Sequence, residues 1–340
     1  IRGSRRAGSG GLGALARMDL NGPFFMNEPV HTPIALATYR PMSPARTQAL
    51  SESLERIAHR AVDRMLAADG VADLVSDYSL VIAREFWLEF LGLPERAAAT
   101  LMRSSAAIVP MLSFSNTPEE IETANRTAEE QWALLEAHYE QTQGTTQGTL
   151  FDMLAPAVAA CDLPGSPRNA AALIAAITFD ALDSVAGATA NVLYTCLTHP
   201  DQWALINEDP GRINAAWREG VRYEPSFIGL HRGALEDIVY DGVLIPGGTN
   251  VVMAWGIGNR DPRVFDDPDR FDISRSTRQA LSFGGGLRIC KGRHLAMLQG
   301  EIALRTLIER IETIELLPEP PDWGAPGLLR AIRRIPVRIG

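Results

Sequence analysis

The residues best suited to chemistry lie in one short stretch, Leu281–Ala296, which reads LSFGGGLRICKGRHLA. In it Cys290 follows a run of glycines and precedes a helical pattern. A thiolate that binds a metal needs N–H donors and positive charge nearby, and a glycine-rich turn at a helix N-terminus supplies both. Glycines also let the backbone lie close to a large flat ligand. The stretch therefore predicts a metal ligand at Cys290; the alternative is a buried free cysteine beside a glycine-rich turn.

The surroundings of this cysteine resemble the cysteine-ligand loop of the cytochrome P450 family, the haem-thiolate monooxygenases. The positions that match the family pattern FxxGxRxCxG are Phe283, Gly286, Arg288, Cys290 and Gly292. The resemblance implies haem b as the cofactor, with Cys290 as the axial ligand of its iron. It also implies that Phe283, Gly284, Arg288 and Gly292 surround the haem, with Arg288 meeting a carboxylate on its rim.

Further family blocks precede this loop in the expected order. Glu219 and Arg222 are three residues apart, so they share a helix face and can pair, and they resemble the ExxR block of the family. The runs 259–262 (NRDP) and 268–271 (PDRF) resemble the next two blocks. The match implies that Glu219, Arg222 and Arg270 form a structural trio behind the haem, with no part in the chemistry.

Asn169–Thr198 reads as one long helix of Ala, Ile, Leu, Val and Thr. At 1.5 Å per residue it would run about 45 Å, and because it is apolar all round it should be buried. Two carboxylates inside it, Asp180 and Asp183, are therefore conspicuous. A buried carboxylate costs several kcal/mol unless it is paired or used.

Counted back from His199-Pro200, this helix resembles the central helix of the family. Asp183 and Ser184 then match the family's acid–alcohol pair, which helps deliver protons during oxygen activation. Serine replaces the usual threonine, and Asp180 and Ala181 replace two small residues. Because Asp180 and Ser184 are four apart they share a helix face. One hypothesis is that Asp180 binds a polar or cationic group of the substrate, or a water; the alternative is a bond to a neighbouring side chain.

The resemblance also implies which residues bind the haem carboxylates. His31, Arg232 and Arg288 match family positions that do so, and arginine suits this role because its guanidinium is planar and always charged. The family arginine four residues after the histidine is replaced by Ala35, so that contact is missing or supplied elsewhere, for instance by Arg40. Otherwise, His31 would be a surface or helix-capping histidine.

The sequence predicts a mainly α fold with a small β-rich region. Helical patterns cover 48–68, 118–143 and 291–311, and short β runs broken by Asp-Gly and Pro-Gly-Gly predict hairpins within 231–255. The resemblance implies a cytochrome P450 fold in one domain over residues 1–340. Residues 1–30 match the family poorly, so the usual N-terminal segment is apparently lacking.

Composition narrows the class of protein. The net charge of −9 argues against nucleic acid as a partner, and no apolar run approaches the ~20 residues that span a bilayer. Three scattered cysteines argue for a reducing compartment, hence the cytoplasm. Abundant alanine, and basic residues that are nearly all arginine, suggest a bacterium with GC-rich DNA.

The implied function is insertion of one oxygen atom of O₂ into a C–H bond of a small or medium organic substrate. No flavin or nicotinamide motif is visible, so electrons are expected from an external ferredoxin. Arg288, Lys291, Arg293 and His294 would form a basic dock for it; the alternative is that they hold haem or cap carbonyls.

Two rival functions remain open from the sequence. One is a haem enzyme driven by peroxide, against which the Asp183–Ser184 pair argues. The other is a haem-binding recruitment module without turnover, as in a biosynthetic assembly line. Ala35 and the Asp180-Ala181 replacement favour the module slightly, whereas the intact cysteine loop argues against it.

Overall fold

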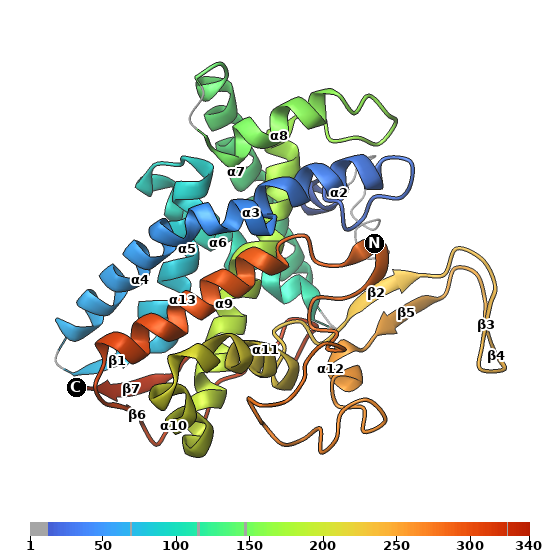
Figure 1. The fold of residues 1–340 in the computed structure, drawn as a ribbon. Helices are drawn as coiled ribbons and strands as arrows, with labels where there is room; N and C mark the ends of the chain where they lie inside the picture. The colour runs from blue at the N-terminus through green and yellow to red at the C-terminus, as the bar shows by residue number, and fades with distance from the viewer. Residues whose placement is uncertain (1–12, 69, 114–115, 146–147, 325) are drawn as a thin grey trace.

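The computed structural model describes residues 13–68, 70–113, 116–145, 148–324 and 326–340. Helices make up most of it, with small sheets at two edges (Figure 1). The predicted mainly α class with a small β-rich region is therefore confirmed. Part of the poorly matched edge, residues 1–12, lies outside the described residues.

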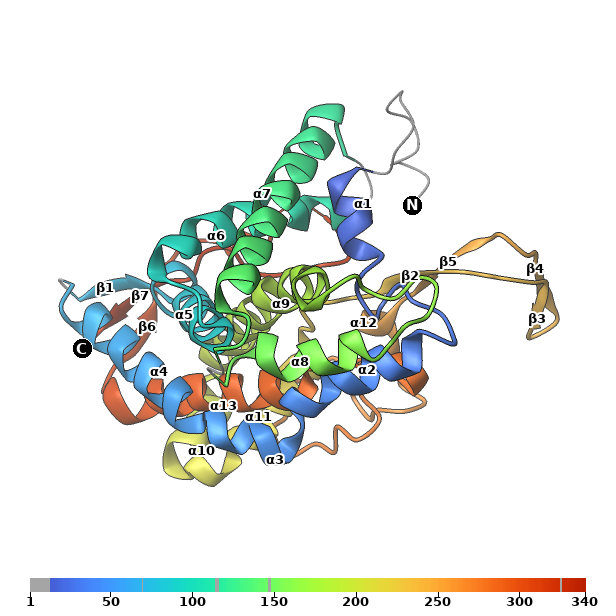
Figure 2. The ribbon, with the colours of Figure 1, turned by 90° about the horizontal axis from the view of Figure 1, so that it is seen from above.

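The helices pack into a broad body in which segments distant in sequence lie side by side (Figures 1 and 2). In chain order they are α1 (Ala14–Asp19), α2 (His31–Tyr39), α3 (Pro44–Thr47), α4 (Ser51–Leu66), α5 (Leu80–Leu91), α6 (Ala98–Ile108), α7 (Pro118–Thr142), α8 (Leu150–Ala159), α9 (Ala170–Thr198), α10 (Pro200–Glu208), α11 (Ile213–Tyr223), α12 (Trp255–Gly258) and α13 (Arg293–Arg310).

Helix α9 forms the predicted central element. Asn169 caps it, because its side-chain oxygen accepts a hydrogen bond from the Ala172 N–H at 2.9 Å. The helix runs through the middle of the body and packs against α5, α7, α11 and α13 (Figure 2). By length and composition it is long and apolar enough to cross a membrane, so the prediction that no apolar run has this length was wrong. Because 76% of its apolar window is buried inside the protein, it is here a core helix.

In the part of the chain that the structure describes, the strands form one three-stranded and two two-stranded antiparallel sheets. They are β1 (Val71–Asp73), β2 (Leu230–Gly233), β3 (Ile238–Tyr240), β4 (Val243–Ile245), β5 (Asn250–Met253), β6 (Ile314–Leu316) and β7 (Pro336–Ile339). The predicted hairpins are confirmed: β3 and β4 meet at Asp241-Gly242, where both φ angles are positive, 48° and 76°. This hairpin extends away from the body (Figures 1 and 2).

The buried ion pair on α11 holds the coil that leads toward the cysteine loop. Glu219 and Arg222 are both fully buried, with 2.7 Å between Arg222 Nε and a Glu219 carboxylate oxygen. Arg222 also donates to the carbonyls of Asn259, Pro268 and Arg270. This gives every charged group of the pair a partner, as burial requires.

The third member of the trio is Arg275, and the prediction of Arg270 was wrong. Arg275 Nε lies 3.2 Å from Glu219, and its side chain is only 11% exposed. Arg270 has an exposed side chain and contributes only its backbone carbonyl. The coil turns after Phe271, so Arg275 reaches Glu219 and Arg270 does not.

Helices α11 and α13 approach each other closely at Gly300. A Cβ atom built there would lie 2.3 Å from ring carbons of Trp217 on α11. Only a residue without a side chain fits. This contact sets the position of α13, the helix that follows the cysteine loop.

Candidate active site

The loop that carries Cys290 is shaped by its glycines. Gly284 and Gly286 have φ angles of +67° and +62°, which side chains rarely adopt. The loop closes where the Cys290 N–H donates to the Phe283 carbonyl at 2.8 Å. Helix α13 then begins beyond Gly292. Cys290 therefore lies just ahead of a helix N-terminus, as the sequence predicted.

Side chains of Met42 and Trp255 lie beside the glycines of the cysteine loop. A Cβ at Gly292 would lie 3.5 Å from Met42 Sδ and 4.0 Å from Cys290 Sγ, and one at Gly284 would lie 3.4 Å from the Trp255 ring. The Cys290 side chain is nevertheless accessible to solvent. Burial by the surrounding atoms raises the pKa of its thiol, while the N–H of Gly292 donates to the sulfur and lowers it.

One turn of α9 is exposed in the middle of an otherwise buried helix. The described side chains from Ala171 to Thr178 and from Val185 to Ala190 are buried. Between them Asp180 is exposed, and Ala181, Asp183 and Ser184 are partly so. The charge of Asp180 raises the pKa of Cys290, so this turn and the cysteine lie near one another.

Asp183 occupies a different environment from Asp180. Its Oδ2 atom is buried and has no hydrogen-bond partner among the described residues. Burial raises the pKa of Asp183 to about 6, and the charge of Arg333 opposes that rise. A carboxyl group with this pKa exchanges protons near neutral pH.

Ser184 follows Asp183 directly, and its hydroxyl donates to the Ala181 carbonyl at 3.2 Å. A hydroxyl has one proton to donate and two lone pairs that accept. The oxygen of Ser184 therefore keeps its capacity to accept a proton from a neighbour. Asp183 and Ser184 together form an acid and an alcohol on the accessible turn.

A cationic cluster gathers residues from three distant segments. Burial lowers the pKa of Arg232, and the charge of Arg288 lowers it further. Burial also lowers the pKa of His31, again with Arg288 adding to the effect and Glu28 opposing it. Among the described residues neither arginine forms an ion pair, so the cluster suits an anionic ligand.

Backbone and ring contacts hold the two arginines in place. Arg288 donates to the carbonyls of Pro23, Phe24 and Met26 and to the side chain of Asn27. The Arg232 guanidinium carbon lies 4.2 Å from the centre of the Phe24 ring.

His31 begins α2 and is 3% exposed, so it is not a surface histidine. Ala35 is buried and the side chain of Arg40 is exposed.

These features fit haem b. Cys290 offers a thiolate to an iron, glycines beside it leave room for a flat ring, and His31, Arg232 and Arg288 can hold carboxylates at its rim. Among the described residues no group of three or more His, Cys, Asp or Glu side chains could hold a metal ion. A haem needs only the single cysteine from this chain.

Comparison with known proteins decides the family. The cytochrome P450 family model matches residues 213–332. The 6-deoxyerythronolide B hydroxylase of Saccharopolyspora erythraea is 33% identical over 319 residues, covering 92% of this chain and 76% of the relative. The cytochrome P450 monooxygenase PikC of Streptomyces venezuelae is 30% identical over 317 residues, covering 91% of this chain and 74% of the relative. The chain belongs to the cytochrome P450 family. It is thus a monooxygenase, an oxidoreductase whose cofactor is haem b.

A solved structure agrees with this P450 in fold. P450BioI, crystallised with an acyl carrier protein bearing hexadec-9Z-enoic acid, has a TM-score of 0.90 and 25% identity, with 96% of this chain and 84% of that chain covered. The cytochrome P450 fold predicted from the sequence is therefore confirmed.

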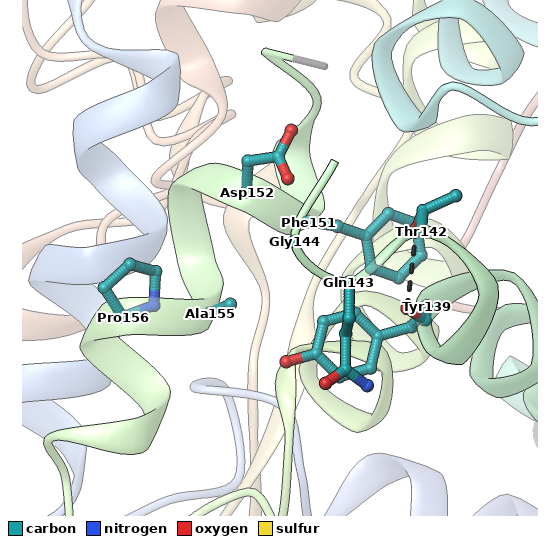
Figure 3. Close-up of a pocket in the computed structure, with 8 residues that line it drawn as sticks. All are labelled: Tyr139, Thr142, Gln143, Gly144, Phe151, Asp152, Ala155 and Pro156. Carbon is teal, nitrogen blue, oxygen red and sulfur yellow. Dashed lines mark hydrogen bonds between the residues drawn. The ribbon is translucent and has the colours of Figure 1, made fainter. Parts of the chain in front are cut away.

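A separate pocket of about 350 Å³ lies between the end of α7 and helix α8 (Figure 3). The rings of Tyr139 and Phe151 stack in its wall, 5.8 Å between centroids. Asp152 and Pro156 also line it. None of the predicted site residues lines this pocket, so it is distinct from the cysteine loop.

Sequence reasoning missed two residues of this P450. Arg275 was passed over because another arginine stood in the family block five residues earlier. Arg333, which acts on Asp183, lies in a C-terminal coil with no motif or periodicity. The signal for Arg333 was Asp183, a carboxylate without an obvious partner inside an apolar helix, whereas nothing in the sequence pointed to Arg275.

Proposed function

We propose that this P450 inserts one oxygen atom of O₂ into a C–H bond of a small or medium organic molecule. The other oxygen leaves as water, so each turnover takes up two electrons and two protons. Bound haem supplies the oxygen activation, because thiolate donation favours O–O cleavage. The observation that carries the proposal is the buried Oδ2 of Asp183, which has no hydrogen-bond partner among the described residues and lies next to Ser184.

The residues of the chain then have distinct roles. Cys290 would bind the haem iron through its thiolate, and Phe283, Gly284 and Gly292 would shape the loop around it. His31, Arg232 and Arg288 hold the haem carboxylates, as the positive cluster supports. These residues bind and orient the cofactor, and none of them needs to change its protonation state.

Asp183 and Ser184 move the protons. With a pKa of about 6, Asp183 can take up a proton and release it near neutral pH. Ser184 can accept that proton and pass its own toward the site. The accessible turn between two buried stretches of α9 supports this route.

The first experiment is the ferrous–carbon monoxide difference spectrum of the purified protein. A red-shifted Soret band typical of thiolate ligation is expected. The band typical of histidine or neutral-thiol ligation would contradict the role of Cys290. Absence of haem would overturn the catalytic proposal.

The proton route is tested with Ser184→Ala, using 7-ethoxycoumarin as a general oxidation probe. We expect most electrons to appear as hydrogen peroxide rather than product. Thr189→Val is the matched control, because the Thr189 hydroxyl also bonds a helix carbonyl, at 2.8 Å, but is buried. Equal product per electron in both variants would refute the route. Product from peroxide alone, at the rate seen with O₂ and ferredoxin, would favour the peroxide-driven alternative.

We also propose that the electron donor is a ferredoxin that docks beside the cysteine loop. Burial lowers the pKa of Lys291 and of His294, and the positive charge of Arg293 lowers both further. Lys291 and Arg293 each donate to a loop carbonyl, but among the described residues neither pairs with a carboxylate. An unneutralised positive patch on an acidic protein attracts an acidic partner.

Charge reversal tests the dock. Lys291→Glu is expected to slow reduction by ferredoxin several-fold at low salt, with a smaller effect at high salt. Arg338→Glu on β7, at the far end of α13, makes the same charge change on an exposed residue and should have little effect. Equal rates in the two variants would remove the docking proposal.

We also propose that residues 1–340 form a single domain. One cluster of buried apolar residues extends from Ala14 to Ile339, which supports this organisation.

A further inference from the structure

A groove of about 410 Å³ lies between α4 and α5, two helices that pack side by side (Figures 1 and 2). Four arginines line it, Arg56, Arg60 and Arg64 from α4 and Arg84 from α5. The three on α4 are spaced four residues apart, so they share one face of that helix. None of the predicted site residues lines the groove, so it is separate from the cysteine loop.

One carboxylate, that of Glu85 on α5, is shared among three of these arginines. Arg64 Nη2 lies 2.7 Å from Glu85 Oε1, and Arg60 Nη2 lies 2.9 Å from Glu85 Oε2. Arg84 Nη2 lies 3.6 Å from Glu85 Oε1. Burial raises the pKa of Glu85, but Arg64 and Arg60 outweigh burial and lower it, so this carboxylate is ionised. Three guanidinium groups beside one carboxylate leave an excess of two positive charges.

Arg84 differs from the arginines on α4, which each donate a hydrogen bond to a carboxylate. Its Nε atom is buried and has no hydrogen-bond partner among the described residues. The contact of 3.6 Å with Glu85 is too long for a hydrogen bond. A buried donor without an acceptor is costly, so a ligand that brings an acceptor to Arg84 is favoured.

The other charges in the groove do not cancel this excess. Glu89 pairs with Arg56, with 2.6 Å between Glu89 Oε2 and Arg56 Nη2, and Glu95 also lines the groove. Counted over all the lining residues, four arginines face three glutamates, so the net charge remains positive. Each arginine on α4 uses only its Nη2 atom for hydrogen bonds to described residues. Their Nε and Nη1 atoms remain available to a ligand.

We propose that this groove binds a phosphate group, with Arg84, Arg60 and Arg64 as its hydrogen-bond donors. Guanidinium groups bind phosphate through two parallel hydrogen bonds, and they stay charged at any ordinary pH. A phosphate monoester carries about two negative charges near pH 7, which matches the excess of two positive charges around Glu85. The groove also has room for an organic group attached to the phosphate, since a water molecule takes up only about 30 Å³ of liquid.

Calorimetry on the haem-loaded protein tests the site with inorganic phosphate, phenyl phosphate and acetate, near neutral pH in a buffer without phosphate. We expect both phosphates to bind at least tenfold more tightly than acetate, which carries one charge. In Arg84→Gln, the affinity for both phosphates should fall at least fivefold. Arg103→Gln on α6 removes an arginine whose side chain is 57% exposed and which lies outside the groove. It makes the same change in net charge and should leave phosphate binding unchanged.

The two phosphates distinguish the sources of the ligand. Tighter binding of phenyl phosphate would identify a phosphorylated organic molecule as the occupant, and equal affinities would identify the free ion. If neither phosphate binds, or if acetate binds as tightly, the inference is wrong. Equal losses in Arg84→Gln and Arg103→Gln would also overturn it, because they would reflect only the charge of the whole protein. Arg64→Gln, with the same expected loss, replaces Arg84→Gln if that variant fails to fold.

Discussion

The corrected ion-pair trio gives the sharpest test of the scaffold. Replacing Arg275 by methionine keeps the apolar stem but removes the guanidinium that lies 3.2 Å from Glu219. It also removes donors to the backbone, including hydrogen bonds of 2.9 Å to the Asp267 carbonyl and 3.3 Å to the Arg270 carbonyl. Arg270→Met is the matched control, because it removes an arginine whose side chain is exposed.

The size of the effect follows from burial. Breaking a buried pair costs about 3–5 kcal/mol, and we expect about 3 kcal/mol for Arg275→Met because Glu219 keeps its bond to Arg222. With an unfolding entropy of roughly 2.1 cal/mol/K per residue, each kcal/mol in a chain of this size lowers Tm by about 1.4 °C. Arg275→Met should therefore lower Tm by about 4 °C. Arg270→Met should change stability by less than about 0.5 kcal/mol.

Thermal denaturation of the haem-loaded proteins, followed by far-ultraviolet circular dichroism, measures both variants. Urea denaturation at 25 °C checks the free energy of unfolding independently. The reasoning fails if Arg270→Met destabilises as much as Arg275→Met, because the trio would then be the one that the sequence motif suggested. It also fails if neither variant changes Tm.

Two further perturbations are expected to have clear outcomes. Burial raises the pKa of Asp183 from 3.8 to about 6, so the folded state binds the proton more tightly and loses stability as pH rises through 6, by up to about 3 kcal/mol. Asp183→Asn should remove this dependence in urea denaturation between pH 4 and 7, and an unchanged slope would contradict the assigned environment. Gly300→Ala should lower the free energy of unfolding by about 1–3 kcal/mol, because the new methyl group meets the Trp217 ring. Gly233→Ala, where a Cβ meets nothing within 4 Å, is its control, and equal losses would refute the packing argument.

The elements that sequence reasoning predicted well are those with a local signal. Helix α9 was predicted to within a residue, because its composition is continuous and Asn169 marks its start. The turn at Asp241-Gly242 follows from residues that tolerate positive φ. The cysteine loop was recognised because its glycines and Cys290 are fixed in spacing by backbone geometry.

Sequence reasoning missed contacts made by residues in coil segments. These segments have no helical or strand pattern from which a contact could be predicted. Whether Arg270 or Arg275 reaches Glu219 depends on how a coil turns, and no pattern in the chain records that turn. The effect of the Arg333 charge on the pKa of Asp183 likewise depends on where the C-terminal coil meets α9. The resemblance indicated that Arg288 lies at the haem rim, but the carbonyls of Pro23, Phe24 and Met26 that hold it became visible only in three dimensions.

The half-buried position of Lys291 has a practical consequence, because it is the only lysine in the chain. Its amine donates to the Leu287 carbonyl at 3.0 Å, and burial lowers its pKa, so a larger share of it is unprotonated at mild pH. Reagents that acylate amines would therefore modify one side chain of the protein, next to the loop that holds the cofactor. Reductive methylation with carbon-13 would give a single lysine methyl resonance there, and a fluorophore coupled to the amine would report on whatever approaches that face.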